Sequence, residues 1–167
     1  MSQVEKMKKA LLEYVIPNLK DNGFCGEYPH YRRVYDDRID IISFNSYKYG
    51  NAFYVDISTV FPNRPNGKQN ISRFFDGNFD NIVTGDCCKI YRLKGNFEHL
   101  FYYTDVYLSF LGSPYLAVSE SKAKTFKRGF FDIRVQKSSP EIYKRVCDKV
   151  NKQMIKAYKW WNKMGKK

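Results

Sequence analysis

Few residues in this chain are of the types that carry out acid–base, nucleophilic or metal chemistry. It has two histidines, His30 and His99, and neither lies in a His-Glu-x-x-His metal motif. His99 could form a thiol site with Cys87 or Cys88 and a carboxylate such as Asp86, but a lone histidine more often has a structural role. We therefore predict no catalytic residue, no metal site and no cofactor.

Carboxylates and glycines offer two other routes to chemistry. Asp36, Asp37 and Asp40 cluster near a predicted hairpin, and paired acids can act as general acid and base or bind a divalent metal. Aspartate is also favoured in turns, which is the simpler interpretation. The ten glycines form neither a GxGxxG nor a GxxxxGK[ST] array. This absence argues against nucleotide-dependent chemistry.

The charge of the chain is concentrated near its C-terminal end. The formal net charge is +12. Residues 1–121 contain 14 basic and 14 acidic side chains, whereas residues 122–167 contain 15 basic and 3 acidic ones. A local basic field attracts acidic partners and is screened by salt. The charge pattern therefore predicts a binding surface for an acidic partner.

This basic region has the periodicity of one amphipathic helix. Ser139 is a plausible N-cap, Pro140 suits the first helical position, and the pattern runs to about Met164. One predicted face is apolar and should pack on the domain: Ile142, Val146, Val150, Met154, Ala157, Trp161 and Met164. The other face carries what we call the basic stripe: Arg145, Lys149, Lys152, Lys156, Lys159 and Lys163.

Two interpretations of the basic stripe remain open, a solvated helix face or a binding surface. Only Glu141 and Asp148 interrupt the basic residues, although a solvated helix usually contains more acidic residues for i,i+4 pairing. Lysine outnumbers arginine, which favours attraction of phosphates or carboxylates over readout of bases. Tyr47, Tyr49 and Tyr54 flank a predicted turn at Gly50, where at least one should point outward and could join a partner surface.

Hydrophobic periodicity predicts an N-terminal helix from about Ser2, bent or divided near Ile16 by Pro17 and ended by Gly23. Residues 97–111 fit a helix, which we favour, although their aromatic content also permits a strand. In the third predicted strand, Tyr54, Asp56 and Ser58 should form a solvated face. The predicted strands are Tyr28–Tyr35, Ile39–Ser46, Ala52–Phe61, Cys87–Leu93, Tyr115–Val118 and Gly129–Val135.

These elements predict one α+β domain over residues 1–167. Its two layers would be a mainly antiparallel sheet and the flanking N-terminal and C-terminal helices. No apolar run suits a secretory signal or a membrane span, so we expect a cytoplasmic protein. The four cysteines are too scattered for a disulfide framework and should be ordinary thiols. The pattern does not specify an oligomeric state.

The N-terminal part of the chain contains four segments in a recognisable order: LKDNGF (Leu19–Phe24), YRR (Tyr31–Arg33), IDIISF (Ile39–Phe44) and FYVDI (Phe53–Ile57). Together they resemble an uncharacterised bacterial family, domain of unknown function 4304. The resemblance implies a compact α+β protein whose relatives include small proteins encoded near toxin genes, and it transfers no catalytic residue. The tryptophan-bearing later half of the family has no counterpart before Trp160 and Trp161.

The sequence thus predicts a non-enzymatic binding module, for instance an immunity-type protein that neutralises a toxin. The partner would be an acidic protein that contacts the basic stripe and the three tyrosines. The alternative is a nucleic-acid-binding protein that uses the same helix as a phosphate track. An enzyme of unrecognised type is the third hypothesis, and the scattered histidines, cysteines and aspartates give it the least support.

Overall fold

The structure is a computed structural model. It describes residues 1–48, 52–61, 90–95, 99–103, 105–110, 113–117, 131–136 and 140–165. For the strands between residues 105 and 136 it describes the backbone alone. The predicted site residue Tyr49 therefore lies outside the described residues, as do Cys87 and Cys88.

The N-terminal helical region consists of two helices, as Pro17 predicted. Helix α1 (Gln3–Tyr14) ends before Val15, and α2 (Ile16–Asp21) begins with Pro17 in its first turn, where its missing N–H costs least. Ser2 caps α1, because its hydroxyl accepts a 3.2 Å bond from the Glu5 amide while the Glu5 carboxylate accepts one from the Ser2 amide. After α2 the chain turns at Gly23, whose φ of 82° favours glycine.

The main sheet is antiparallel and has the order β1-β2-β3-β4-β5, with β6 also paired to β4. Pairing between β3 and β4 is the longest, with Phe44 opposite Val55 and Asp40 opposite Thr59. The short strand β1 was not predicted, because the sequence pattern merged it with the turn before β2. The six strands are β1 (Cys25–Glu27), β2 (His30–Val34), β3 (Ile39–Ser46), β4 (Ala52–Val60), β5 (Ile90–Arg92) and β6 (Phe101–Tyr102).

The preferred helix over residues 97–111 is wrong. The described part of this segment contains β6 and the strand β7 (Asp105–Phe110), so the aromatic and β-branched side chains favoured extended backbone over the helical spacing. Strand β7 lies between β8 (Ser113–Ala117) and β9 (Phe131–Gln136) in a second, three-stranded antiparallel sheet. These last two strands confirm the predicted ones, with boundaries shifted by one or two residues.

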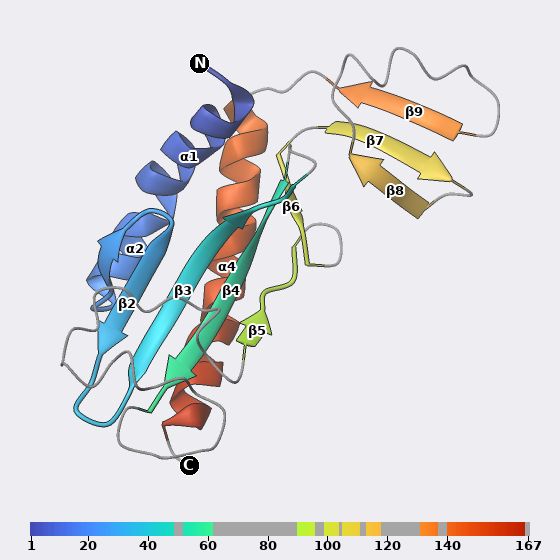
Figure 1. Ribbon diagram of the computed structural model, residues 1–167. Coiled ribbons are helices and arrows are strands. Elements are labelled where there is room, and N and C mark those ends of the chain that lie inside the picture. Colours follow the sequence, from blue (N-terminus) through green and yellow to red (C-terminus); the bar gives the residue numbers. More distant parts are fainter. Residues whose placement is uncertain are drawn as a thin grey trace.

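Helices α1 and α4 (Pro140–Met164) cover the same face of the main sheet (Figure 1). Their apolar sides and alternate residues of β3 and β4, such as Phe44 and Val55, form one buried core. Trp161 fixes the end of α4 there: its ring centroid lies 5.0 Å from that of Phe24. Its indole N–H donates a 2.9 Å hydrogen bond to the Ser58 carbonyl. The predicted α+β architecture is confirmed.

The opposite side of β4 is not the solvated face that alternation predicted. Asp56 is 5% exposed and Ser58 is fully buried. Asp56 tolerates burial because Arg92 donates two hydrogen bonds to its carboxylate, at 2.7 and 3.1 Å, and Asn45 donates a third. Alternating polarity identified the two faces of the strand but not their exposure.

None of the helices in the described ranges combines the length and the apolar character that crossing a bilayer requires.

Candidate functional site

The basic stripe lies along the outer side of α4. Five of its six side chains are exposed and Lys149 is half-buried, whereas the predicted apolar side from Ile142 to Trp161 is buried and Met164 is half-buried. In the described part of the chain, none of the six forms an ion pair with an acidic residue. The stripe is therefore a row of basic side chains with which the described acidic residues do not pair.

Two stripe residues also line a cavity of about 710 Å³ between α4 and the chain beyond β5. Lys149 and Lys156 stand two helical turns apart, with Gln153 between them on the same side. We call this space the lysine cavity. Its described lining consists of Lys94, Gly95, His99, Lys149, Gln153 and Lys156, and contains no carboxylate.

Gln153 is the most buried polar residue that lines this cavity. It is 7% exposed, and none of the described residues forms a hydrogen bond with its side-chain amide. The amide atoms of Gln153 are not among the buried polar atoms without a partner in the described ranges, so they reach the open space of the cavity, where water or a ligand can bond to them. The amide of Gln153 is thus available to a molecule that enters the cavity.

Gly95 lets the segments that carry Lys94 and His99 approach each other closely. A Cβ atom at this position would overlap the backbone carbonyl group of Leu100, so the chain at Gly95 approaches the residue after His99 more closely than any side chain permits. Lys94 and His99 are thereby held on the same side of the cavity. A larger residue at position 95 would force the two segments apart.

A second cavity of about 400 Å³ shares His99 with the first. The guanidinium carbon of Arg92 lies 4.1 Å from the centroid of the Tyr54 ring, while Asp56 holds the same group by two hydrogen bonds. The hydrogen bond to Asp56 raises the pKa of Arg92, so the group remains a cation. We call this space the tyrosine cavity; its lining is Ser46, Tyr47, Lys48, Tyr54, Arg92, His99 and Leu100.

Four of the predicted site residues line one of these two cavities, and the other described ones line neither. Tyr47 and Tyr54 line the tyrosine cavity, and Lys149 and Lys156 line the lysine cavity beside it. The remaining stripe residues line neither cavity: Arg145, Lys152, Lys159 and Lys163.

Sequence reasoning missed three residues of the lysine cavity. Lys94 and His99 lie far from α4 in the sequence, and only the pairing of β5 and β6 with β4 brings them near it. Gln153 did leave a signal, since it is an uncharged polar residue between two lysines at helical spacing. His99, which was interpreted as structural, lies where the two cavities meet.

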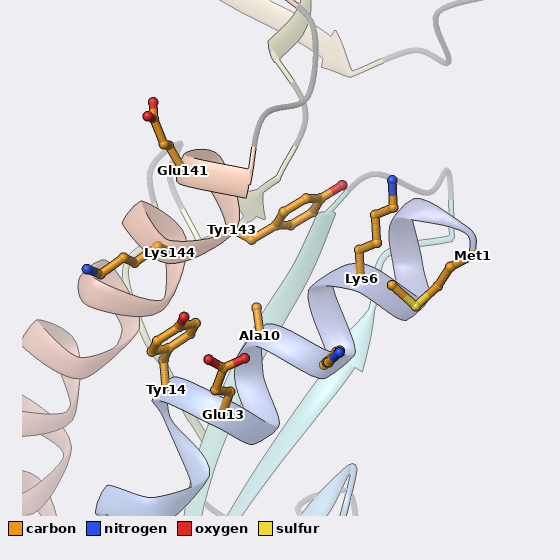
Figure 2. A pocket seen from close by; sticks show the side chains of 9 residues that line it. Met1, Lys6, Ala10, Glu13, Tyr14, Glu141, Tyr143 and Lys144 are labelled. Atoms are coloured by element: carbon orange, nitrogen blue, oxygen red, sulfur yellow. The ribbon is translucent and has the colours of Figure 1, made fainter.

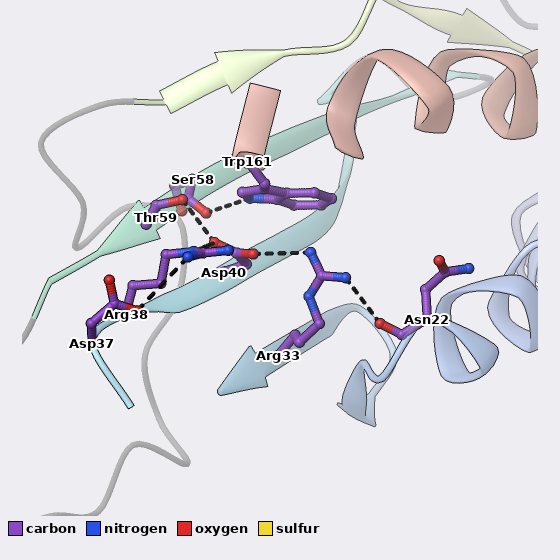
Figure 3. Close-up of polar contacts among 8 residues, drawn as sticks. All are labelled: Asn22, Arg33, Asp37, Arg38, Asp40, Ser58, Thr59 and Trp161. Atoms are coloured by element: carbon purple, nitrogen blue, oxygen red, sulfur yellow. Dashed lines mark hydrogen bonds and ion pairs between the residues drawn. The ribbon is translucent and has the colours of Figure 1, made fainter. Parts of the chain in front are cut away.

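The aspartate cluster of the first hairpin has a structural role. Asp40 is fully buried, and its carboxylate accepts hydrogen bonds from Arg33 at 3.0 Å, Arg38 at 3.3 Å and Thr59 at 3.0 Å (Figure 3). Asp37 lies 3.7 Å from Arg38 on the exposed side of the turn. With both oxygens of Asp40 occupied, this carboxylate is not free to act on a substrate or to bind a metal. No group of metal-ligating side chains is found in the described ranges.

The described residues also include a serine–histidine pair and two free thiols. His30 Nδ1 lies 2.9 Å from Ser43 Oγ, but Ser43 is fully buried in β3, out of reach of a substrate. Burial raises the pKa of the Cys147 thiol to about 12, so it stays protonated and unreactive at neutral pH. Cys25 is exposed.

A third cavity, of about 430 Å³, lies between the outer side of α1 and the first turns of α4 (Figure 2). Met1, Ala10 and the two rings of Tyr14 and Tyr143 give it an apolar floor. Its rim mixes both signs of charge: Lys6, Lys9, Glu13, Glu141 and Lys144. A mixed rim selects no particular charge, unlike the lysine cavity.

Comparison with known families identifies one match. The family model described as Domain of unknown function (DUF4304) matches residues 15–100, just over half of the chain and well beyond the segments that carry the resemblance. Neither curated proteins nor solved structures give a match. Lys94 and His99 lie inside the matched region, whereas α4 lies outside it.

Proposed function

The chain belongs to the domain of unknown function family DUF4304, and we propose that it is a cytoplasmic, non-enzymatic binding module for an acidic protein. The basic stripe is the contact surface, with which the chain covers an acidic surface of its partner as an immunity protein covers a toxin. The observation that carries this proposal is the row of six basic side chains on α4, none of which forms an ion pair with an acidic residue in the described ranges.

The stripe is a surface that a partner would stabilise. Arg145 and Lys149 are one turn apart, as are Lys152 and Lys156, and Lys159 and Lys163. Each such pair of like charges destabilises a helix by about 0.2–0.5 kcal/mol. An acidic partner removes this repulsion, and complementary charge raises the rate of encounter.

A protein partner is favoured over nucleic acid by the composition of the stripe and by the surface beside it. Five of its six residues are lysines, which attract carboxylates without the bidentate geometry that arginine brings to bases and phosphates. Tyr47 and Tyr54, both half-buried, lie next to the lysine cavity, and tyrosine is enriched in protein interfaces. Nucleic acid is the competing outcome of the test below.

The test is affinity capture from a lysate of the cells that produce the protein, with and without nuclease treatment. We compare the wild type with a stripe variant that carries Lys152→Glu, Lys159→Glu and Lys163→Glu, all exposed. The expected result is one stoichiometric acidic protein that survives nuclease and is lost with the stripe variant. These changes avoid both cavities.

The matched control carries Lys6→Glu, Lys9→Glu and Lys20→Glu, three exposed lysines of α1 and α2, and has the same net charge as the stripe variant. It should still capture the partner. Equal loss in both variants would mean that net charge alone controls binding, which contradicts a defined surface on α4. Recovery of mixed nucleic acid that nuclease removes would replace this proposal with the phosphate-track alternative.

A further inference from the structure

The lysine cavity has the charge of a site for a small, strongly anionic ligand. Lys94, Lys149 and Lys156 contribute three cations from two separate segments, His99 adds a ring nitrogen, and the described lining includes no carboxylate. None of the three lysines is paired with an acidic residue in the described ranges. Converging lysines without a counter-ion repel one another until an anion enters.

The side-chain amide of Gln153 adds hydrogen-bond donors to the same cavity. Gln153 is 7% exposed and lies between the two lysines of α4, so its N–H donors meet the same space as the ammonium groups. A ligand that satisfies both must offer several acceptor oxygens within one small group. A phosphate monoester offers three such oxygens and nearly two negative charges, whereas a carboxylate offers two oxygens and one charge.

The size of the cavity indicates that the phosphate belongs to a larger molecule. A volume of about 710 Å³ is within the range of small-molecule sites and well above the needs of one phosphate ion. The tyrosine cavity shares the lining residue His99 with it. There Arg92, 45% exposed and fixed by Asp56, presents a rigid planar cation beside Tyr47 and Tyr54.

We propose that the lysine cavity binds the phosphate group of a small phosphomonoester, whose organic part extends past His99 into the tyrosine cavity. Lys94, Lys149 and Lys156 neutralise the phosphate, and the Gln153 amide donates to one of its oxygens. The glycine-rich loops that the sequence lacks are not required, because lysine side chains replace backbone amides as the phosphate ligands. The proposal holds whether or not the basic stripe binds a protein.

The test is isothermal titration calorimetry on the full chain with two phosphomonoesters, adenosine monophosphate and ribose 5-phosphate. Their unphosphorylated counterparts, adenosine and ribose, and inorganic phosphate complete the set. At least one phosphomonoester should bind at one site per chain, more tightly than inorganic phosphate, and its counterpart should not bind. Which of the two binds identifies the organic part as a nucleoside or a sugar.

The cavity variant and its control each replace two lysines of α4 with glutamine, so the two variants have the same net charge. Lys149→Gln with Lys156→Gln should weaken binding by roughly tenfold or more for each lysine, since each lost charged hydrogen bond is worth about 1.4 kcal/mol or more. The matched control, Lys152→Gln with Lys159→Gln, changes two exposed lysines outside the cavity and should bind like the wild type. Gln153→Glu places a carboxylate beside the phosphate and should abolish binding.

Several results would overturn the proposal. They are failure of both phosphomonoesters to bind, equal binding of their unphosphorylated counterparts, or equal weakening in the cavity and control variants. Inorganic phosphate that binds as tightly as either ester would indicate an adventitious ion only. Thermal unfolding of each variant, with a midpoint near that of the wild type, confirms that the change acts on binding and not on folding. None of these outcomes affects capture of an acidic protein through the exposed stripe residues.

Discussion

At the scale of single residues, the most constrained group among those described is the carboxylate of Asp40. It is fully buried, and its three donors come from β2, from the turn before β3 and from β4. Arg33 also donates to the Asn22 carbonyl at 3.1 Å, which ties the end of α2 to the same network (Figure 3). A buried charge of this kind is retained only when it is paired and hydrogen-bonded.

Asp40→Asn should lower the free energy of unfolding by about 3–5 kcal/mol, because it leaves Arg33 largely buried without a counter-charge and leaves Arg38 with only the more distant Asp37. Urea denaturation followed by circular dichroism measures the difference. Asp36→Asn, at an exposed position of the same turn, is the control and should change the free energy by less than about 0.5 kcal/mol. Similar losses in both variants would contradict a structural role for the network.

His30 makes stability depend on pH. Burial, with a smaller contribution from the positive charge of Arg32, lowers the pKa of His30 below its usual 6.5. The unfolded chain therefore binds this proton at a higher pH than the folded chain does. As pH falls below about 6.5, the unfolded state gains the proton first, so the free energy of unfolding decreases.

We expect His30→Gln, which keeps a polar partner for Ser43, to remove this part of the acid sensitivity. Urea unfolding at several values between pH 7.5 and pH 5 should show the wild type losing more stability than the variant over that interval. His99→Gln serves as the control for the other histidine. Parallel curves for the wild type and His30→Gln would show that another group is responsible.

At the scale of elements, α4 separates a packing side from an exposed, basic side. Its buried side includes Trp161, whereas the neighbouring Trp160 is half-buried and its ring centroid lies 6.1 Å from that of Tyr91 at the border of β5. The two tryptophans are adjacent in sequence and differ in direction by about 100° around the helix. They therefore provide a direct comparison of the two sides.

Trp161→Ala should cost about 3–5 kcal/mol of unfolding free energy, since it removes a large core ring and leaves the Ser58 carbonyl without its donor. Trp160→Ala should cost clearly less, because its ring is only half-buried. Urea denaturation of both variants gives the comparison. If Trp160→Ala is the more damaging change, the assignment of the two helix sides is wrong.

Local sequence rules predicted the elements that one strong signal controls. Pro17 predicted the break between α1 and α2, Gly23 predicted the end of α2, and the 3.6-residue period of α4 predicted its buried and exposed sides. Residues 97–111 were predicted wrongly, because a helical spacing of apolar residues there competed with a high content of tyrosine and phenylalanine. Pairing with distant strands favoured the extended conformation, and the spacing of apolar residues along the chain contains no information about such pairing.

The candidate site was likewise predicted only in part. The stripe residues follow from periodicity along one helix, and their exposure agrees with it. The lysine cavity depends on Lys94 and His99, which approach α4 only through the order of strands in the sheet. Burial of Asp56 also escaped prediction, because its partners Arg92 and Asn45 come from two other strands. Contacts between elements could not be predicted from the sequence where no motif specified them.

At the scale of the whole molecule, a net charge of +12 opposes compactness, and much of it lies on α4. Self-repulsion of this kind is screened by salt, because exposed charges interact over about one Debye length. The buried pairs around Asp40 are shielded from solvent and respond much less.

The thermal midpoint should therefore rise when sodium chloride is increased from about 20 mM to about 0.3 M, a range over which the Debye length shortens severalfold. Differential scanning fluorimetry measures this midpoint. The Lys152→Gln, Lys159→Gln and Lys163→Gln triple variant should show a smaller rise, since it contains less repulsion. A variant that follows the wild-type salt response would indicate that repulsion along the stripe does not limit stability.

The arrangement of α4 also affects how the protein is made. Strands β1 to β4 are synthesised long before α4. The sheet face formed by Phe44, Val55 and Ile57 nevertheless needs the apolar side of α4 as its cover. During translation this face stays open to solvent, and exposed apolar surface of this kind attracts other chains and chaperones. Folding of the core therefore has to wait for one of the last segments to be synthesised, and a ribosome that stalls before residue 140 would hold an uncovered and aggregation-prone sheet.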